Sequence, residues 1–116
     1  MNETGSCVTI HAGRRIRERI GVNKKAIQTI SDRALIKGLS HNELKGKLKQ
    51  YIDALYFKRS TANNIKVYAE KVYIFNENIL ITVVSLPTGL KRIANKLFQG
   101  KKEQKLKDNN IIKDQL

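Results

Sequence analysis

The chain has 116 residues, 41% of them hydrophobic, which is enough for one modest core and excludes a predominantly disordered protein. Its 23 lysines and arginines outnumber 10 acidic residues, and the net charge of +13 favours RNA or DNA as partner before an anionic membrane. Cys7 is the only cysteine, so an internal disulfide is excluded; this, with no recognisable signal peptide or membrane span, predicts a cytoplasmic location.

The chain is expected to begin with a flexible segment over residues 1–8, with a short strand near residues 7–10. A first helix is predicted over residues 10–20, because Thr9 is a suitable N-cap and Gly21 a natural stop.

Two further helices are predicted before the middle of the chain. Apolar residues recur at helical spacing over residues 23–37, and Gly38 occupies the position of a left-handed C-terminal cap. A longer amphipathic helix is predicted over residues 41–58, because Ser40 and Glu43 have the spacing of a capping box.

The hydrophobic period then changes from helical to alternating. Strands are predicted over residues 65–68, 71–75 and 79–86, joined by tight turns into an antiparallel meander. After Pro87, a last helix is predicted over residues 88–98. The fold class is therefore α+β, with N-terminal helices, an antiparallel meander of three or four strands and a C-terminal helix.

A single domain is predicted over residues 9–99. Residues 100–116 are charged and lack a sustained apolar stripe, so they form either a disordered basic tail or an extension of the last helix.

The first predicted helix carries the strongest candidate site. His11, Arg15 and Arg19 are four residues apart, so they lie close to one face, with Arg14 and Arg17 beside it. An imidazole can exchange a proton near neutral pH and a guanidinium can hold a phosphate, as RNA cleavage by the 2′-hydroxyl requires. A basic, solvated helix that only binds nucleic acid is the alternative.

Other residues are candidates for nucleic-acid contact. Lys24 and Lys25 begin the second predicted helix, and Tyr68 and Tyr73 lie on predicted strands, where they either stack on bases or fill the core. Thr82 interrupts the most apolar strand, and its hydroxyl contacts either a phosphate or the backbone. Since metal-binding motifs such as HExxH and CxxC are absent from the sequence, neither a metal nor a cofactor is expected.

Residues 11–21 read HAGRRIRERIG, which resembles the signature His-Ala-x-x-Arg-x-x-x-Arg-Gly of a family of small bacterial and phage proteins. That family is similar to RelE-type and BrnT-type toxin ribonucleases. His11, Arg15 and Arg19 match the signature, with Ile20 standing before the glycine, and Thr82 matches a strand threonine. The resemblance implies a RelE-like fold and a ribonuclease site made of these four residues.

Two classes of function follow. The first is an RNA-directed, toxin-like endoribonuclease that needs no metal and is paired with a cognate antitoxin. The second is a non-catalytic module, such as a phage-encoded inhibitor bound to a host defence protein, or a nucleic-acid- or nucleotide-binding protein. The sequence leaves the oligomeric state open.

Overall fold

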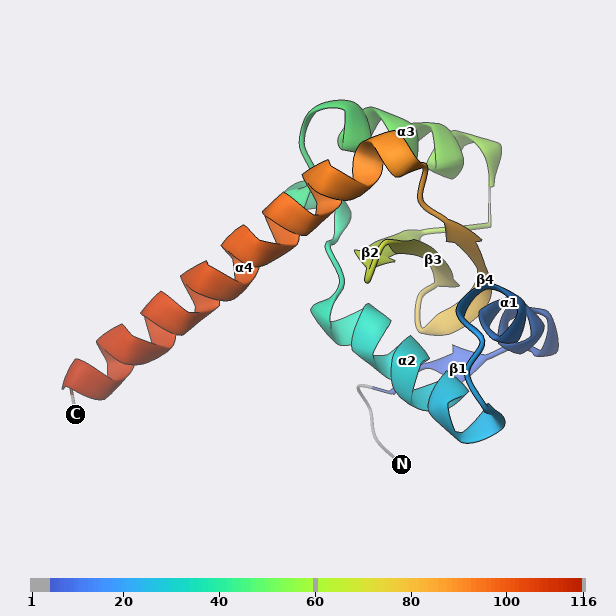
Figure 1. Ribbon diagram of the computed structural model, residues 1–116, viewed down its shortest axis with the longest axis horizontal. Coiled ribbons are helices and arrows are strands. Elements are labelled where there is room, and N and C mark those ends of the chain that lie inside the picture. The colour runs from blue at the N-terminus through green and yellow to red at the C-terminus, as the bar shows by residue number, and fades with distance from the viewer. Residues whose placement is uncertain (1–4, 60, 116) are drawn as a thin grey trace.

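A four-stranded sheet lies between two pairs of helices. The computed structural model describes residues 5–59 and 61–115, with the side chains of Lys24 and residues 103–115 excepted. In chain order the elements are β1 (Cys7–Val8), α1 (Ile10–Ile20), α2 (Lys24–Lys37), the short 3-10 helix η1 (His41–Glu43), α3 (Gly46–Lys58), β2 (Asn64–Tyr68), β3 (Lys71–Asn76), β4 (Ile79–Ser85) and α4 (Thr88–Gln115). Figure 1 shows α1 and α2 on one side of the sheet, with α3 and the start of α4 on the other. The predicted α+β class is confirmed.

The sheet has the strand order β1-β4-β3-β2. Strands β2, β3 and β4 form the predicted antiparallel meander, but β1 pairs with β4 in parallel. The prediction of a wholly antiparallel sheet is therefore wrong at this edge. The short strand predicted near residues 7–10 is present over Cys7–Val8, but two residues carry no pattern that predicts which strand they pair with or in which direction.

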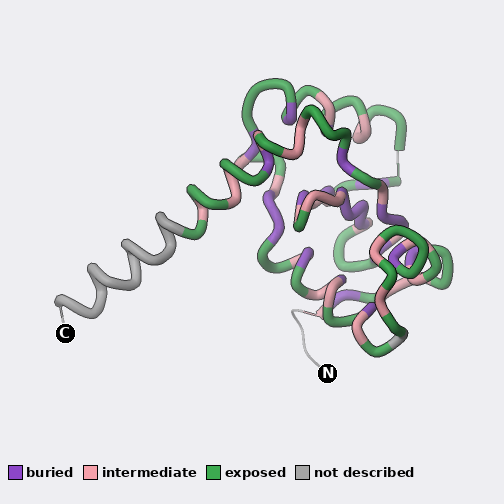
Figure 2. Tube along the Cα trace, in the orientation of Figure 1, coloured by how far each residue is buried: buried purple, intermediate pink, exposed green. Residues whose placement is uncertain are grey.

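Two hydrophobic cores cover the two faces of the sheet. Ala12, Ile16 and Ile27 of α1 and α2 pack with Tyr73 and Phe75 of β3. On the other face, α3 and α4 pack against a second set of strand residues: Ile65, Val67, Val72 and Ile74. Figure 2 shows the buried residues concentrated in the strands and on the inward sides of the helices. Both faces are apolar, which explains the nearly continuous hydrophobic run of β3.

The first two helices begin as predicted. Thr9 Oγ1 accepts a hydrogen bond from Ala12 N at 3.1 Å, and Gly21 ends α1 in the left-handed conformation with φ 76°. Asn23 Oδ1 caps α2 by accepting from Ala26 N at 3.0 Å. These local signals place α1 and α2 within one residue of their predicted bounds.

Gly38 is extended rather than left-handed, with φ −65° and ψ 159°, so the predicted cap conformation is wrong. Its role is close packing: a Cβ placed there would lie 2.5 Å from Ala34 O and 3.0 Å from Lys66 Cβ. A larger residue would push α2 away from β2.

The predicted helix over residues 41–58 is divided in two. Ser40 N donates to Glu43 Oε1 at 2.9 Å, so the predicted capping interaction forms but closes only the single turn η1. Leu44 then turns into the core in an extended conformation, and Gly46 has φ 60° at the start of α3. This positive φ is outside the right-handed helical region, so the helix cannot be continuous here.

Helix α4 extends past the predicted end at residue 98 and includes most of residues 100–116, for which the sequence left a tail and a helical extension open. Lys101 Nζ donates to Gly38 O at 2.9 Å and to Glu43 Oε1 at 3.0 Å. Burial raises the pKa of Glu43, but hydrogen bonds from Ser40 and Lys101 outweigh it and hold this pKa below its usual value. Lys101 thus ties α4 to the end of α2 and to η1.

The residues before β1 are held to α2 by a polar network. Asp32 Oδ1 accepts from Ser6 N at 2.8 Å, from Ser6 Oγ at 2.7 Å and from Gln28 Nε2 at 2.9 Å. Burial raises the pKa of Asp32, but the hydrogen bonds from Ser6 and Gln28 outweigh it and hold this pKa below its usual value. Ser6 and the residues of β1 belong to the segment that was expected to be flexible, and they are bonded to the fold. Residues 1–4 lie outside the residues that the structure describes.

Asp32→Asn is expected to lower the free energy of unfolding by about 1 kcal/mol near pH 7. Hydrogen bonds to a charged carboxylate are stronger than those to a neutral amide oxygen, but solvent screens part of this difference. Since the folded pKa lies below the unfolded one, the carboxylate stabilises the fold above the unfolded pKa. This contribution is lost as the pH falls through the folded pKa. Urea unfolding of both proteins at about pH 7 and about pH 2.5 measures the effect; an equal difference at both pH values would contradict it.

Candidate active site

Helix α1 and strand β4 bring three of the predicted site residues together. His11 Nε2 lies 3.3 Å from Thr82 Oγ1 and 3.5 Å from Arg15 Nε. His11 is exposed, Arg15 is half-buried and Thr82 is only 4% exposed. A titratable ring at the surface is thus flanked by a cation and a hydroxyl from a rigid strand.

Strand β4 contains a bulge next to Thr82. Ile74 pairs with Thr82 and Phe75 pairs with Leu80, so Ile81 is an extra residue in β4. The extra residue changes the alternation of side chains, so that Leu80 and Val83 both enter the core under α1 and α2. Thr82, between them in the strand, is buried, and its hydroxyl reaches His11 Nε2 near the start of α1.

Thr9 fixes the start of α1 against the same strand. Its Oγ1 donates to Leu80 O at 3.0 Å, and its backbone N donates to the same oxygen at 3.3 Å. His11 is two residues further along, so the position of its backbone relative to β4 is set by these bonds.

The hydrogen bonds define the roles of the atoms at the site. Arg15 Nε can only donate, so His11 Nε2 is the acceptor in this geometry, and Thr82 Oγ1 donates to the same nitrogen. A neutral ring then carries its proton on Nδ1. Both contacts are long, so the Nε2 lone pair remains available to a stronger donor.

Glu18 is a neighbour that the sequence analysis did not single out. Its Oε2 accepts from Arg15 Nη1 at 3.0 Å, in a pair that is partly exposed to solvent. The spacing of three residues on one helix was the signal that could have identified it. This carboxylate holds the guanidinium beside His11 but also competes with any phosphate for it.

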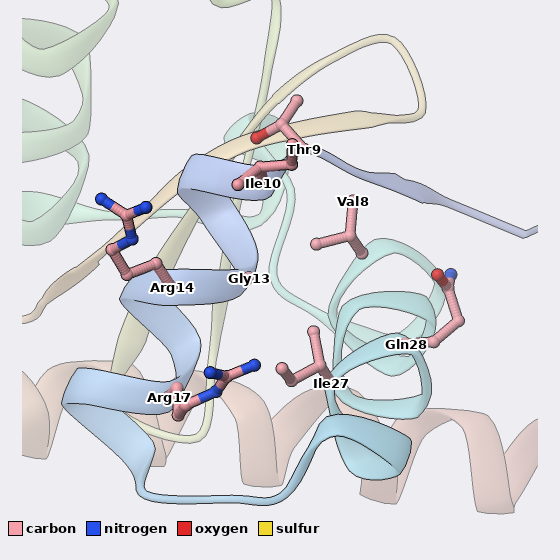
Figure 3. Close-up of a pocket in the computed structure, with 8 residues that line it drawn as sticks. All are labelled: Val8, Thr9, Ile10, Gly13, Arg14, Arg17, Ile27 and Gln28. Atoms are coloured by element: carbon pink, nitrogen blue, oxygen red, sulfur yellow. The ribbon is translucent and has the colours of Figure 1, made fainter.

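The remaining arginines of α1 lie elsewhere on the helix. Arg19 is exposed one turn beyond Arg15, roughly 12 Å along the axis from His11. Arg14 and Arg17 line an open pocket of about 450 Å³ between α1 and α2. Figure 3 shows Arg17 extending from α1 toward Ile27 of α2, with Arg14 one turn earlier on α1. Gln28 and Val8, on the other side of this pocket, were also not singled out from the sequence.

The other predicted nucleic-acid contacts fall into different environments. Lys25 is exposed at the start of α2, and the side chain of Lys24 is not among those that the structure describes. Tyr73 is 1% exposed, so its ring presents no open face to a base, and its expected stacking role is replaced by a core role. Burial, with a contribution from Tyr68, raises the pKa of the Tyr73 hydroxyl. Tyr68 is half-buried, with ring centroids 6.3 Å from Tyr73 and 5.8 Å from Phe98.

Two general properties hold for the part of the chain that the structure describes. None of its helices combines the length and apolar composition needed to cross a membrane. Within the same residues, no three His, Cys, Asp or Glu side chains gather closely enough to hold a metal ion.

Comparison with protein-family models, with curated proteins and with solved structures found no match to this chain. The resemblance to RelE-type and BrnT-type ribonucleases therefore stays a prediction from the residues of α1.

Proposed function

We propose that this protein is an RNA-directed endoribonuclease that acts without a metal at His11, Arg15 and Thr82. The observation that carries this is the meeting of a histidine acceptor nitrogen, an arginine and a buried threonine hydroxyl within 3.5 Å. The net charge of +13 supports a polyanionic substrate. The N-terminal signature resembling toxin ribonucleases agrees with the same reading.

Each residue has a role in transfer of the phosphate to the 2′-oxygen. His11 Nε2 takes the proton of the 2′-hydroxyl as that oxygen attacks phosphorus. The bond from phosphorus to the 5′-oxygen then breaks, the leaving oxygen takes a proton from water, and the hydroxide so formed takes the proton held on His11. The products are a 2′,3′-cyclic phosphate and a 5′-hydroxyl.

Arg15 and Thr82 support this step in different ways. The guanidinium of Arg15 lies beside His11, where it can donate two hydrogen bonds to the non-bridging oxygens and stabilise the added charge on phosphorus. Thr82, held in the strand, orients the imidazole through its hydroxyl. Thr82 is a positioning residue, whereas His11 and Arg15 touch the reacting groups.

Binding without cleavage is the second candidate, and the pair between Arg15 and Glu18 favours it. A phosphate must compete with the carboxylate for the guanidinium, and the charge-neutral pair weakens the field at His11. The same surface would then act as a nucleic-acid-binding module, in a phage-encoded inhibitor or a small regulator.

The experiment that tests cleavage uses the purified full-length chain and a pool of single-stranded RNA in the presence of EDTA. New fragments with 2′,3′-cyclic phosphate ends, and an intact pool of the corresponding DNA, are the expected result. Arg15→Gln is run beside the wild type and is expected to cleave much more slowly. Intact RNA with the wild type, under conditions where RNA binding is measured, would overturn cleavage and leave binding as the function.

Glu18→Gln is expected to raise the affinity for single-stranded RNA by about 2- to 5-fold, because an exposed ion pair of modest strength no longer competes with phosphate. Fluorescence anisotropy with a labelled oligonucleotide measures the change. Glu77→Gln, an exposed acidic residue in the turn between β3 and β4, is the matched control. An equal gain in both variants would assign the effect to net charge rather than to Arg15.

A further inference from the structure

The pocket between α1 and α2 combines an apolar lining with positive charge. Its volume of about 450 Å³ is that of a small-molecule site, which usually measures roughly 300–1,000 Å³. Figure 3 shows the residues around it, which come from the end of β1, from α1 and from α2. A ligand that fits must have an apolar, compact part and an anionic part.

The apolar part of the pocket suits a flat ring. Val8 and Ile27 supply aliphatic side chains, and Gly13 on α1 supplies none. A Cβ built on Gly13 would lie 3.7 Å from Val8 Cγ1, an ordinary contact distance, so Val8 lies close to the helix backbone at this glycine. A nucleobase is a ring thin enough to lie against this backbone.

The charged part of the pocket suits a phosphate. Arg14 and Arg17 are both exposed, and among the described residues no carboxylate lies within ion-pair distance of either. A guanidinium binds phosphate through two hydrogen bonds and also stacks on the face of a base. Arg17 extends toward Ile27, over the apolar part of the pocket (Figure 3).

Gln28 adds a polar group of fixed orientation. Its Nε2 donates to Ser6 O at 2.6 Å and to Asp32 Oδ1 at 2.9 Å. The amide nitrogen is therefore committed to the protein, and the carbonyl oxygen Oε1 is the atom that can accept from an N–H of a base edge.

We propose that this pocket binds a nucleoside phosphate, with the base against Val8, Gly13 and Ile27, the phosphate on Arg17, and Arg14 at the outer edge of the pocket (Figure 3). The ligand is either a free 5′-nucleotide or one nucleotide of an RNA strand. Gly13 and Arg17 lie more than about 100° round α1 from His11, whereas Arg14 lies about 60° from it, so most of the pocket lining on α1 is away from the candidate active site. Nucleotide binding here therefore does not require cleavage at His11.

The test is isothermal titration calorimetry of the full-length protein at low salt with the four 5′-ribonucleotides and with inorganic phosphate. Gly13→Leu fills the pocket from α1, and leucine is a better helix former than glycine, so α1 is retained. It is expected to weaken nucleotide binding by about tenfold or more, whereas Gly13→Ala, which adds only one methyl group against the base, is expected to weaken it less than Gly13→Leu.

A second pair of variants tests the charges. The double variant that combines Arg14→Gln and Arg17→Gln is expected to weaken nucleotide binding by about tenfold or more. The control, Lys47→Gln with Lys49→Gln, removes the same charge from exposed positions on α3, on the other side of the sheet, and is expected to leave binding unchanged.

A short oligoribonucleotide distinguishes the two sources of the ligand. Binding more than about tenfold tighter than the mononucleotide, and lost in Gly13→Leu, supports a nucleotide of an RNA strand; equal affinities support a free nucleotide. Equal binding of inorganic phosphate and nucleotides would overturn recognition of the base. Absence of saturable nucleotide binding, or full binding by Gly13→Leu and by the double arginine variant, would overturn the site.

Discussion

His11→Ala is expected to lower the rate of RNA cleavage by about 10²- to 10⁴-fold, the usual contribution of general acid–base catalysis, while RNA affinity changes little. The imidazole accepts from Arg15 and Thr82, so its removal takes away the group that receives the 2′ proton. The arginines of α1 that are expected to bind phosphate are unchanged in this variant, so RNA affinity is retained. The loss should therefore be in kcat, with KM nearly unchanged.

His41→Ala is the matched control for this variant. His41 is exposed on η1, and its Nε2 lies 2.5 Å from Asp53 Oδ1. The residue that follows η1, Leu44, belongs to the core under α3 and α4. Cleavage by His41→Ala should equal that of the wild type. If His11→Ala retains the wild-type rate, His11 has no role as the base, and the active-site assignment fails even if the protein binds RNA.

Thr82→Val separates positioning from proton transfer. Valine keeps the shape of the side chain in β4 but cannot donate to His11 Nε2. A reduced kcat with an unchanged fold would show that the hydroxyl orients the imidazole. Restoration of the rate by Thr82→Ser, which returns a hydroxyl, is expected only if the hydroxyl acts in this way.

The parts of the fold that local signals encode were predictable. The caps at Thr9 and Asn23 and the stop at Gly21 give α1 and α2 nearly residue by residue, since each acts through neighbours within four positions. The meander from β2 to β4 was predictable because its strands are joined by short turns. The pairing of β1 with β4 was not, because partners more than 70 residues apart leave no pattern in so short a strand.

The division of the third helix shows a competition that the sequence pattern hid. The capping signal at Ser40 and the apolar stripe beyond it were both real, yet they belong to two separate elements. Leu44 is buried between them in an extended conformation, so tertiary packing sets the break. Gly46, with φ 60°, is the residue that allows the chain to turn there.

Local spacing predicted the candidate site only along α1, where four residues separate His11 from Arg15. Thr82 was joined to them only through the resemblance to the toxin-ribonuclease signature, because its contact with His11 joins residues 71 positions apart, next to a bulge in β4. No local pattern predicts a bulge that alters which side chains share a face. The same helix also turns Arg17 about 120° away from His11, toward the pocket beside α2.

The affinity for single-stranded RNA is expected to fall by about 100-fold between 50 and 200 mM monovalent salt. Five cations on α1 and the start of α2 are exposed or half-exposed, namely Arg14, Arg15, Arg17, Arg19 and Lys25. Each phosphate contact on a single strand releases about 0.7 counterions, so five contacts give a slope of about −3.5 on logarithmic axes. Anisotropy titrations at several salt concentrations measure this slope directly.

Variants at two places show whether α1 is the surface responsible. Arg14→Gln with Arg17→Gln should reduce the slope by about 1.4, because two phosphate contacts are lost. Lys47→Gln with Lys49→Gln on α3 lowers the net charge equally but should leave the slope unchanged. Equal changes in both double variants would mean that RNA responds to the overall charge of the protein, and an affinity independent of salt would exclude a phosphate-binding surface on α1 altogether.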